Sequence, residues 1–92
     1  AAKLLLMTRA FEDWGVDRLD IKTDARNDVA RRAIAGTGAR FEAVLHAWQP
    51  SLAPGEEGRV RDTAMFCVTA VDWPRVKAHL EEKIARRLAG AR

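Results

Sequence analysis

The chain has one cysteine, no tyrosine and no long apolar run. A single thiol, Cys67, cannot form an internal disulfide, and neither His46 nor His79 has the neighbours that would build a metal site with it. A membrane-spanning helix needs roughly 18 apolar residues in succession, and neither such a run nor a signal-peptide pattern is present. These absences argue against a metal or a membrane as a partner, and they favour a reducing, cytoplasmic setting.

The residues that are present suffice for one folded domain. Ninety-two residues allow at most one domain, and a hydrophobic content of 48% excludes a disordered chain. Lysine and arginine number 16 against 13 acidic residues, and the two signs are interleaved rather than gathered in blocks. The net charge of +3 therefore indicates solvated charged faces first, with a phosphate-bearing ligand as the second interpretation.

The first half of the chain has the pattern of a helix, a strand and a second helix. Apolar residues three, four and seven apart predict a helix over 2–14, and alternation predicts a strand over 16–23 with one buried face. Turn residues at 24–27 lead into a short helix, which Gly36 and Gly38 end.

The second half predicts two strands and a last helix. A strand over 39–48 would bury one alternating face unless a bulge near Val44 shifts it, and the longest strand is predicted over 60–71. The loop 49–58 between them is rich in proline and glycine, so it is an exposed hairpin connection. Asp72-Trp-Pro74 then opens a helix with an N-cap and an early proline, which completes the order α-β-α-β-β-α.

Five short segments, in this order and spacing, carry a resemblance to a known family. They are Lys3-Leu-Leu-Leu6, Lys22-Thr-Asp24 with Asn27, Gly38-Ala-Arg-Phe-Glu42, Gly58-Arg-Val-Arg-Asp-Thr63 and Asp72-Trp-Pro74. Together they resemble the GNAT superfamily of acetyl-CoA-dependent N-acetyltransferases, in the branch that acetylates the N-termini of ribosomal proteins. The resemblance covers nearly the whole chain. It implies an α/β (α+β) fold, a GNAT-like mixed sheet flanked by helices, of which residues 1–92 form the second half only.

The resemblance also implies a reaction and its partners. Acetyl would pass from acetyl-CoA to a primary amine, with a protein N-terminus as one candidate, in a direct ternary complex. The apolar helix at the start of the chain has no capping residue before it, which resembles a cut end. Relatives hold the coenzyme pyrophosphate on a glycine loop at this place. We therefore expect a single domain fragment, 1–92, that pairs with a missing N-terminal half or with a second copy.

The cofactor-binding residues follow from the resemblance. Asn27 would lie beside the pantetheine arm, where an amide donates and accepts at once, and its position also suits a helix cap. Arg31 follows one helical turn later, and Lys3 lies where the missing loop would join, so both would meet the negative charge of acetyl-CoA. A solvated helix face is the alternative for Arg31, as it is for Arg26 and Arg32.

The residues that would move protons depart from the family's pattern. Ala30 stands where some relatives carry a serine, and Gln49 stands near where others carry a glutamate. The tyrosine acid of many relatives is absent, because the chain has no tyrosine. Glu42 and Asp62 are the remaining local candidates, since either could accept an amine proton through water. A structural salt bridge is the alternative for both.

The three tryptophans have different interpretations. Trp14 lies on the apolar stripe of the first helix and Trp73 precedes a helix-starting proline, so both are predicted to pack in the core. Trp48, at a strand end beside the long loop, would line an acceptor pocket or pack in the core. Cys67 has no nearby histidine or helix N-terminus, so we expect no reactive thiolate there.

Two other functions compete with the enzyme. A chain without the tyrosine acid could keep the fold as a non-catalytic coenzyme A-binding or interaction module. A nucleic-acid-binding α/β domain would explain the arginines, but no strand interleaves aromatic and basic residues as stacking modules do, and no recognition-helix motif is present. Steep salt dependence would distinguish nucleic-acid binding from the other two functions.

Overall fold

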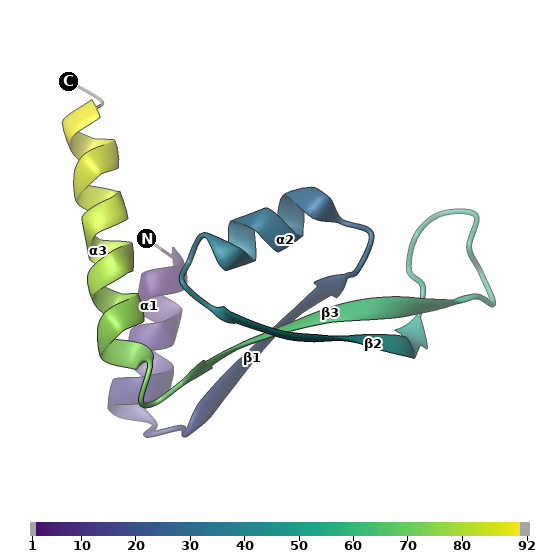
Figure 1. Ribbon diagram of the computed structural model, residues 1–92, viewed down its shortest axis with the longest axis horizontal. Coiled ribbons are helices and arrows are strands. Elements are labelled where there is room, and N and C mark those ends of the chain that lie inside the picture. Colours follow the sequence, from purple (N-terminus) through teal and green to yellow (C-terminus); the bar gives the residue numbers. More distant parts are fainter. Residues whose placement is uncertain (1, 91–92) are drawn as a thin grey trace.

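The computed structural model describes residues 2–90. Along the chain the elements are α1 (Ala2–Thr8), a π-helical turn η1 (Arg9–Asp13), β1 (Arg18–Asp24), α2 (Asp28–Ala35), β2 (Arg40–Pro50), β3 (Val60–Thr69) and α3 (Trp73–Gly90). This order confirms the predicted α-β-α-β-β-α arrangement, with the first helix in two parts (Figure 1). None of the described helices is long and apolar enough to cross a membrane.

The three strands form one sheet in the order β1-β3-β2. Leu19 and Ile21 of β1 lie opposite Val68 and Phe66 of β3, so the alternating apolar residues of the two strands share one face. Both pairings among the described residues are antiparallel, whereas a mixed sheet also includes a parallel pair. β2 has eleven residues and β3 has ten, so the prediction that 60–71 forms the longest strand is wrong.

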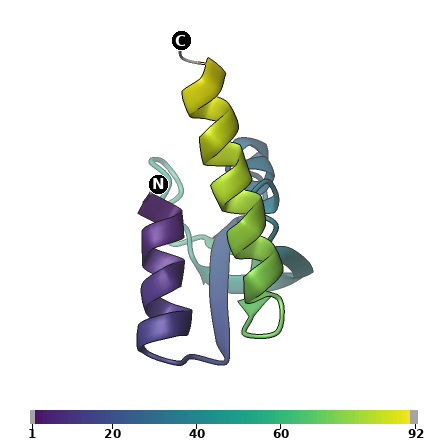
Figure 2. The same cartoon turned by 90° about the vertical axis from the view of Figure 1, so that its left-hand side faces the viewer.

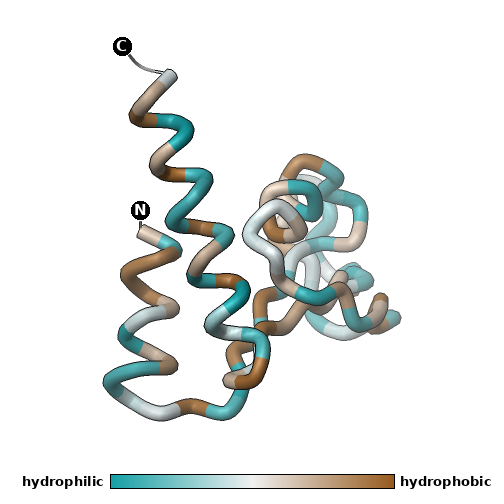
Figure 3. The backbone as a smooth tube through the Cα atoms, turned by 60° about the vertical axis from the view of Figure 1, so that its left-hand side comes forward, coloured by the Kyte–Doolittle hydropathy of each residue, from teal (hydrophilic) through white to brown (hydrophobic). Residues whose placement is uncertain are grey.

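The core lies between one face of the sheet and the helices. Buried side chains from β3 meet buried side chains from each of the three helices, and the central members are Met7, Ile34, Phe66, Val68, Val76 and Leu80. Figure 2 shows α1 and α3 side by side and running in opposite directions. Figure 3 shows an apolar run in α1 and an alternation of apolar and polar residues along α3. This packing brings the start of α1 beside the second half of α3.

The first helix departs from its prediction at Arg9. A regular helix over 2–14 would keep Trp14 on the apolar stripe, but in η1 the backbone N–H of Trp14 donates to the carbonyl of Arg9 at 3.0 Å, five residues back. The wider turn moves the following side chains out of the 3.6-residue period. Trp14 is therefore 66% exposed, and its predicted core packing is wrong. Trp73 is 6% exposed and stacks on Phe11, with 5.2 Å between the ring centroids, which confirms the prediction for Trp73.

β2 is irregular at two places. Its register against β3 shifts between Phe41 and Ala43, and again within 45–49, where Ala47 has a φ of 51°. Phe41 consequently lies opposite Phe66 on the helix side of the sheet, whereas Ala43 falls on the other face. The irregularity that the sequence allowed near the middle of this strand is confirmed, and it begins slightly earlier than predicted.

Candidate functional site

Asn27 caps α2 at the turn that follows β1. Asp24 closes this turn, because its Oδ1 accepts a hydrogen bond from the backbone N–H of Arg26 at 2.9 Å. Asn27 Oδ1 accepts from the backbone N–H of Ala30 at 3.0 Å, which confirms the capping role. Within residues 2–90 the amide nitrogen of Asn27 has no acceptor, and the residue is exposed. Its two N–H groups are therefore available to a ligand.

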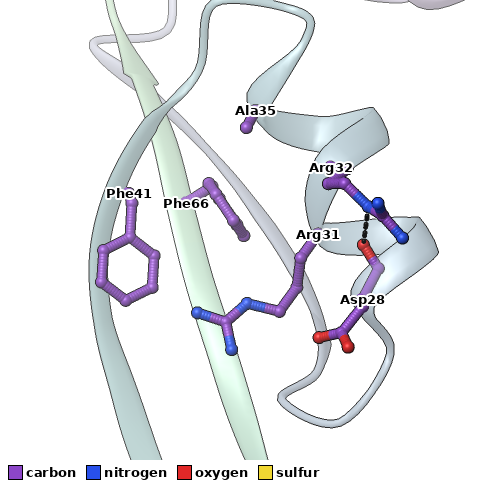
Figure 4. A pocket seen from close by; sticks show the side chains of 6 residues that line it. All are labelled: Asp28, Arg31, Arg32, Ala35, Phe41 and Phe66. Atoms are coloured by element: carbon purple, nitrogen blue, oxygen red, sulfur yellow. Dashed lines mark hydrogen bonds between the residues drawn. The ribbon is translucent and has the colours of Figure 1, made fainter.

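Arg31 lies one turn further along α2. Its side chain lies over the face of the sheet instead of extending into solvent. Its Nη1 donates to the carbonyl of Ala25 at 3.0 Å, and its guanidinium carbon lies 5.5 Å from the centre of the Phe41 ring. It lines an open groove of about 500 Å³, the α2 groove, together with Asp28, Arg32, Ala35, Phe41 and Phe66. Figure 4 shows how these side chains lie. Because Arg31 is half-buried, the solvated-face interpretation does not hold for it, while Arg32 is exposed.

The structure does not bring the three predicted cofactor residues into one cavity. Asn27 is not part of the lining of the α2 groove. Lys3 belongs to α1 and lines two other hollows, one against α3 and one beside β1. A single ligand that touches all three residues therefore has to extend along the helices, as a long and flexible cofactor can.

Arg26 is held in an ion-pair network rather than free in solvent. Its Nη2 lies 2.8 Å from Asp24 Oδ2, and its Nη1 lies 2.7 Å from Glu56 Oε2. The Ser51 hydroxyl also donates to Glu56 at 2.6 Å. The hydrogen bonds from Arg26, which have the larger effect, and the hydrogen bond from Ser51 lower the pKa of Glu56 to about 2. Arg26 thus ties the long hairpin loop to the turn that carries Asn27.

Glu42 is engaged in structural contacts. Arg18 Nη2 lies 2.7 Å from its carboxylate. A hydrogen bond from the Cys67 thiol, and then the contact with Arg18, hold the pKa of Glu42 below its usual range. Cys67 itself is buried, and burial raises the pKa of its thiol, which disfavours the thiolate. Glu42 therefore forms the salt bridge that was the alternative interpretation of this residue, and the raised pKa of Cys67 agrees with the expectation that it is not reactive.

Asp62 organises the irregular part of β2. Its Oδ1 accepts from the backbone N–H of Ala47 at 2.9 Å, and its Oδ2 lies 3.2 Å from His46 Nδ1. The hydrogen bond from the backbone of Ala47, which has the larger effect, and the hydrogen bond from His46 lower the pKa of Asp62. A carboxylate whose pKa is lowered is a weaker base, so both acidic candidates are poorly suited to proton transfer.

A second hollow contains residues that the sequence interpretation missed. Lys3 of α1 and Lys83 and Arg87 of α3 line a space of about 380 Å³, the α1–α3 hollow. Lysine and arginine four residues apart lie on one helix face, and that spacing was the available signal in the sequence. Only the tertiary packing shows that Lys3 joins them.

The remaining predicted features add no chemistry. Trp48 is 51% exposed, so it does not pack in the core, and it lines none of the three hollows described here. Within residues 2–90, no group of three or more His, Cys, Asp or Glu side chains is placed to hold a metal ion.

Comparison with known proteins places this arrangement among acetyltransferases. No protein-family model and no curated protein matches the chain. A putative acetyltransferase is 38% identical to it, with a TM-score of 0.79, over 89% of this chain and 42% of the other. A putative acetyltransferase from T. thermophilus is 36% identical, with the same TM-score of 0.79 and the same coverage of 89% and 42%. A GCN5-related N-acetyltransferase from Brucella melitensis is 32% identical, with a TM-score of 0.73, over 84% and 33%.

These similarities cover most of this chain and a smaller part of the solved structures. The chain spans 33% to 42% of the length of these three acetyltransferases. A further structural neighbour, from Chromobacterium violaceum, is a probable acetyltransferase of the GNAT family with 30% identity and a TM-score of 0.67. The described chain therefore has a GNAT-like α+β fold, the fold of acetyltransferases.

Proposed function

We propose that this chain is part of a GNAT N-acetyltransferase that moves acetyl from acetyl-CoA to a primary amine. The observation that carries the proposal is the match to an acetyltransferase structure at 38% identity and a TM-score of 0.79 over 89% of the chain. The same proposal includes the branch that acetylates ribosomal-protein N-termini, a protein N-terminus as the acceptor, and a reducing, cytoplasmic setting. It also includes a missing N-terminal half, or a second copy, as the partner of residues 1–92.

Acetyl transfer requires a neutral amine held against a thioester carbonyl. The amine nitrogen bonds to the carbonyl carbon, the carbon–sulfur bond breaks, the nitrogen loses a proton and the thiolate gains one. In this proposal the chain contributes binding and orientation. Asn27 donates from Nδ2 to a carbonyl of the pantetheine arm, while its Oδ1 stays on the Ala30 N–H. Arg31 fixes the turn through the carbonyl of Ala25 and turns its remaining N–H groups toward phosphate oxygens.

The proposal assigns no side chain of this chain to proton transfer. Glu42 and Asp62 are held in contacts that lower the pKa of each, and the chain has no tyrosine. In this proposal, water or a group of the partner of residues 1–92 carries the proton away from the amine and supplies the one that the thiolate gains. The same two observations favour a second candidate, a module that binds coenzyme A and catalyses nothing.

One assay distinguishes these two candidates. The protein, together with the proposed partner of residues 1–92, is incubated with acetyl-CoA and a short peptide, and the release of free coenzyme A thiol is measured. We expect release with a free peptide N-terminus and none with an acetylated N-terminus. Binding of acetyl-CoA without thiol release, over a panel of amines, would support the non-catalytic module. Neither binding nor release would refute both candidates.

A further inference from the structure

β1 is an edge strand whose outer side has no neighbouring strand among residues 2–90. The sheet order is β1-β3-β2, so β1 pairs with β3 alone. Its register against β3 is continuous, from Arg18 opposite Thr69 to Asp24 opposite Thr63. β2, the other edge, has two register shifts, and such irregularities hinder a further strand from pairing. β1 is therefore the edge that is suited to another strand.

The backbone groups on this edge belong to the even-numbered residues of β1. The carbonyl of Asp17 accepts from the N–H of Ala70 at one end of the pairing, and the N–H of Ala25 donates to the carbonyl of Asp62 at the other. Hydrogen bonding in an antiparallel pair alternates along a strand, so the odd-numbered residues between these ends bond to β3. The N–H and C=O groups of the even-numbered residues consequently point away from β3, toward the open edge.

The same even-numbered residues carry charges of alternating sign. They are Arg18, Asp20, Lys22 and Asp24. Arg18 pairs with Asp20, and Asp24 pairs with Arg26, whereas Lys22 forms no ion pair within the described part of the chain. In the reverse direction the sign is opposite at every one of these positions. β1 is therefore complementary in charge to an antiparallel copy of itself.

An apolar hollow of about 300 Å³ lies beside this edge. Its walls include Leu6 of α1 and Leu19 and Ile21 of β1. Leu6 is 57% exposed, and Leu19 and Ile21 are only partly buried. Apolar surface next to unpaired backbone groups is the combination that an added strand covers.

We propose that β1 pairs with β1 of a second copy of this chain, antiparallel and about a two-fold axis at Ile21. The proposed function includes a second copy as a partner, and the interface rests on that part of it. Asp20 then lies opposite Lys22 of the second copy, and Arg18 lies opposite Asp24 of the second copy. Ile21 meets its own counterpart beside the two apolar hollows, and the two sheets continue as one.

The charges select this register over its alternatives. The backbone groups at the open edge pair even-numbered residues with even-numbered ones, so the axis could also lie at Asp20 or at Lys22. An axis at Asp20 would place Asp20 opposite itself and Arg18 opposite Lys22. An axis at Lys22 would place Lys22 opposite itself and Asp20 opposite Asp24. Like charges directly opposite one another destabilise a sheet, whereas the axis at Ile21 makes every charged pair complementary, as a self-complementary two-fold interface requires.

Two charge reversals test this interface by sedimentation velocity on residues 1–92 at micromolar concentrations. Lys22→Glu leaves acidic residues opposite one another in both symmetry-related pairs, and Asp20→Lys leaves basic ones there. Each variant alone should raise the Kd of the dimer about tenfold or more, because two attractive pairs become repulsive. An equimolar mixture of the two variants should regain the dimer, since each acidic strand then faces a basic one. Arg87→Glu, at an exposed position of α3, carries the same change of charge as Lys22→Glu and is the matched control.

The outcomes separate this interface from the proposed enzyme. Dimers in the wild type, the control and the mixture, with monomers in each reversal alone, would support the interface. A dimer that withstands both reversals, or a mixture that stays monomeric, would overturn it. A wild type that stays monomeric would overturn it too, and binding of the missing N-terminal half in place of a second copy would assign the edge to that half. Acetyl transfer is measured separately, so a dimer without activity refutes the enzyme alone.

Discussion

Replacing Asn27 can separate its role as the cap of α2 from its proposed role as an amide donor to the cofactor arm. Serine keeps the capping role alone, and alanine keeps neither. Serine ranks with asparagine as an N-cap, so Asn27→Ser retains an oxygen for the Ala30 N–H, now 3.0 Å from Asn27 Oδ1. Asn27→Ala loses the cap, which costs about 1 kcal/mol and lowers the Tm by about 4–8 °C. Both variants lose the amide donor. A neutral hydrogen bond contributes about 0.5–1.5 kcal/mol, so the Kd for acetyl-CoA should rise roughly two- to tenfold in both.

The assay pairs thermal unfolding with calorimetric titration of acetyl-CoA. We expect Asn27→Ser to unfold like the wild type and to bind acetyl-CoA more weakly, and Asn27→Ala to show both losses. Wild-type affinity in the serine variant would refute the contact between Asn27 and the cofactor arm. Weak binding by the alanine variant alone would mean that the cap, rather than the amide, supports the site.

Other individual contacts can be tested in the same way. Ala30→Ser should leave the turnover number nearly unchanged or modestly raised, and a large fall in a folded variant would show that the site requires a small residue there. Because Arg26 lowers the pKa of Glu56 to about 2, the ion pair stabilises the fold above the ordinary glutamate pKa and is lost as the pH falls through about 2. Glu56→Gln should therefore melt below the wild type at neutral pH and alongside it near pH 2. Trp73→Phe keeps a ring against Phe11 but loses the 2.9 Å hydrogen bond to Glu12 and part of the buried ring system, so it should cost less than Trp73→Ala, which should lose about 3–5 kcal/mol in urea unfolding. Equal losses in the two variants would contradict the stacking.

The order of the elements and the main strand faces could be predicted from the sequence. The predicted alternation of side chains between the two faces of the sheet is found in β1 and in the buried part of β3. A side-chain period of two depends on the local geometry of a strand alone. The cap at Asn27 and the end of α2 at Gly36 were also visible, because capping is a local preference of a few residue types. Trp14 was misplaced because a π turn adds a residue to one helical turn and leaves no clear trace in the hydrophobic pattern.

The candidate site was less predictable, since its contacts join residues far apart in the chain. The sequence allowed two interpretations of Arg26, a solvated helix face or a contact with phosphate. In the structure its guanidinium pairs with Glu56, thirty residues later in the chain. Arg31 lies over the ring of Phe41 in β2, and the sequence pattern of α2 alone does not show which strand residue its side chain meets. Lys83 and Arg87 meet Lys3 only through the packing of α1 on α3.

The strand order has a consequence for how the chain is made. β3 lies between β1 and β2 although it follows both in the sequence, so neither earlier strand has its partner until synthesis has passed Thr69. The β2–β3 hairpin closes a short loop, whereas β1 pairs with β3 across a much longer segment and pays a larger loop-closure entropy. We expect the hairpin to form first and β1 to dock last. The nascent chain thus exposes two unpaired strands on the ribosome, and this interval is its most vulnerable to aggregation.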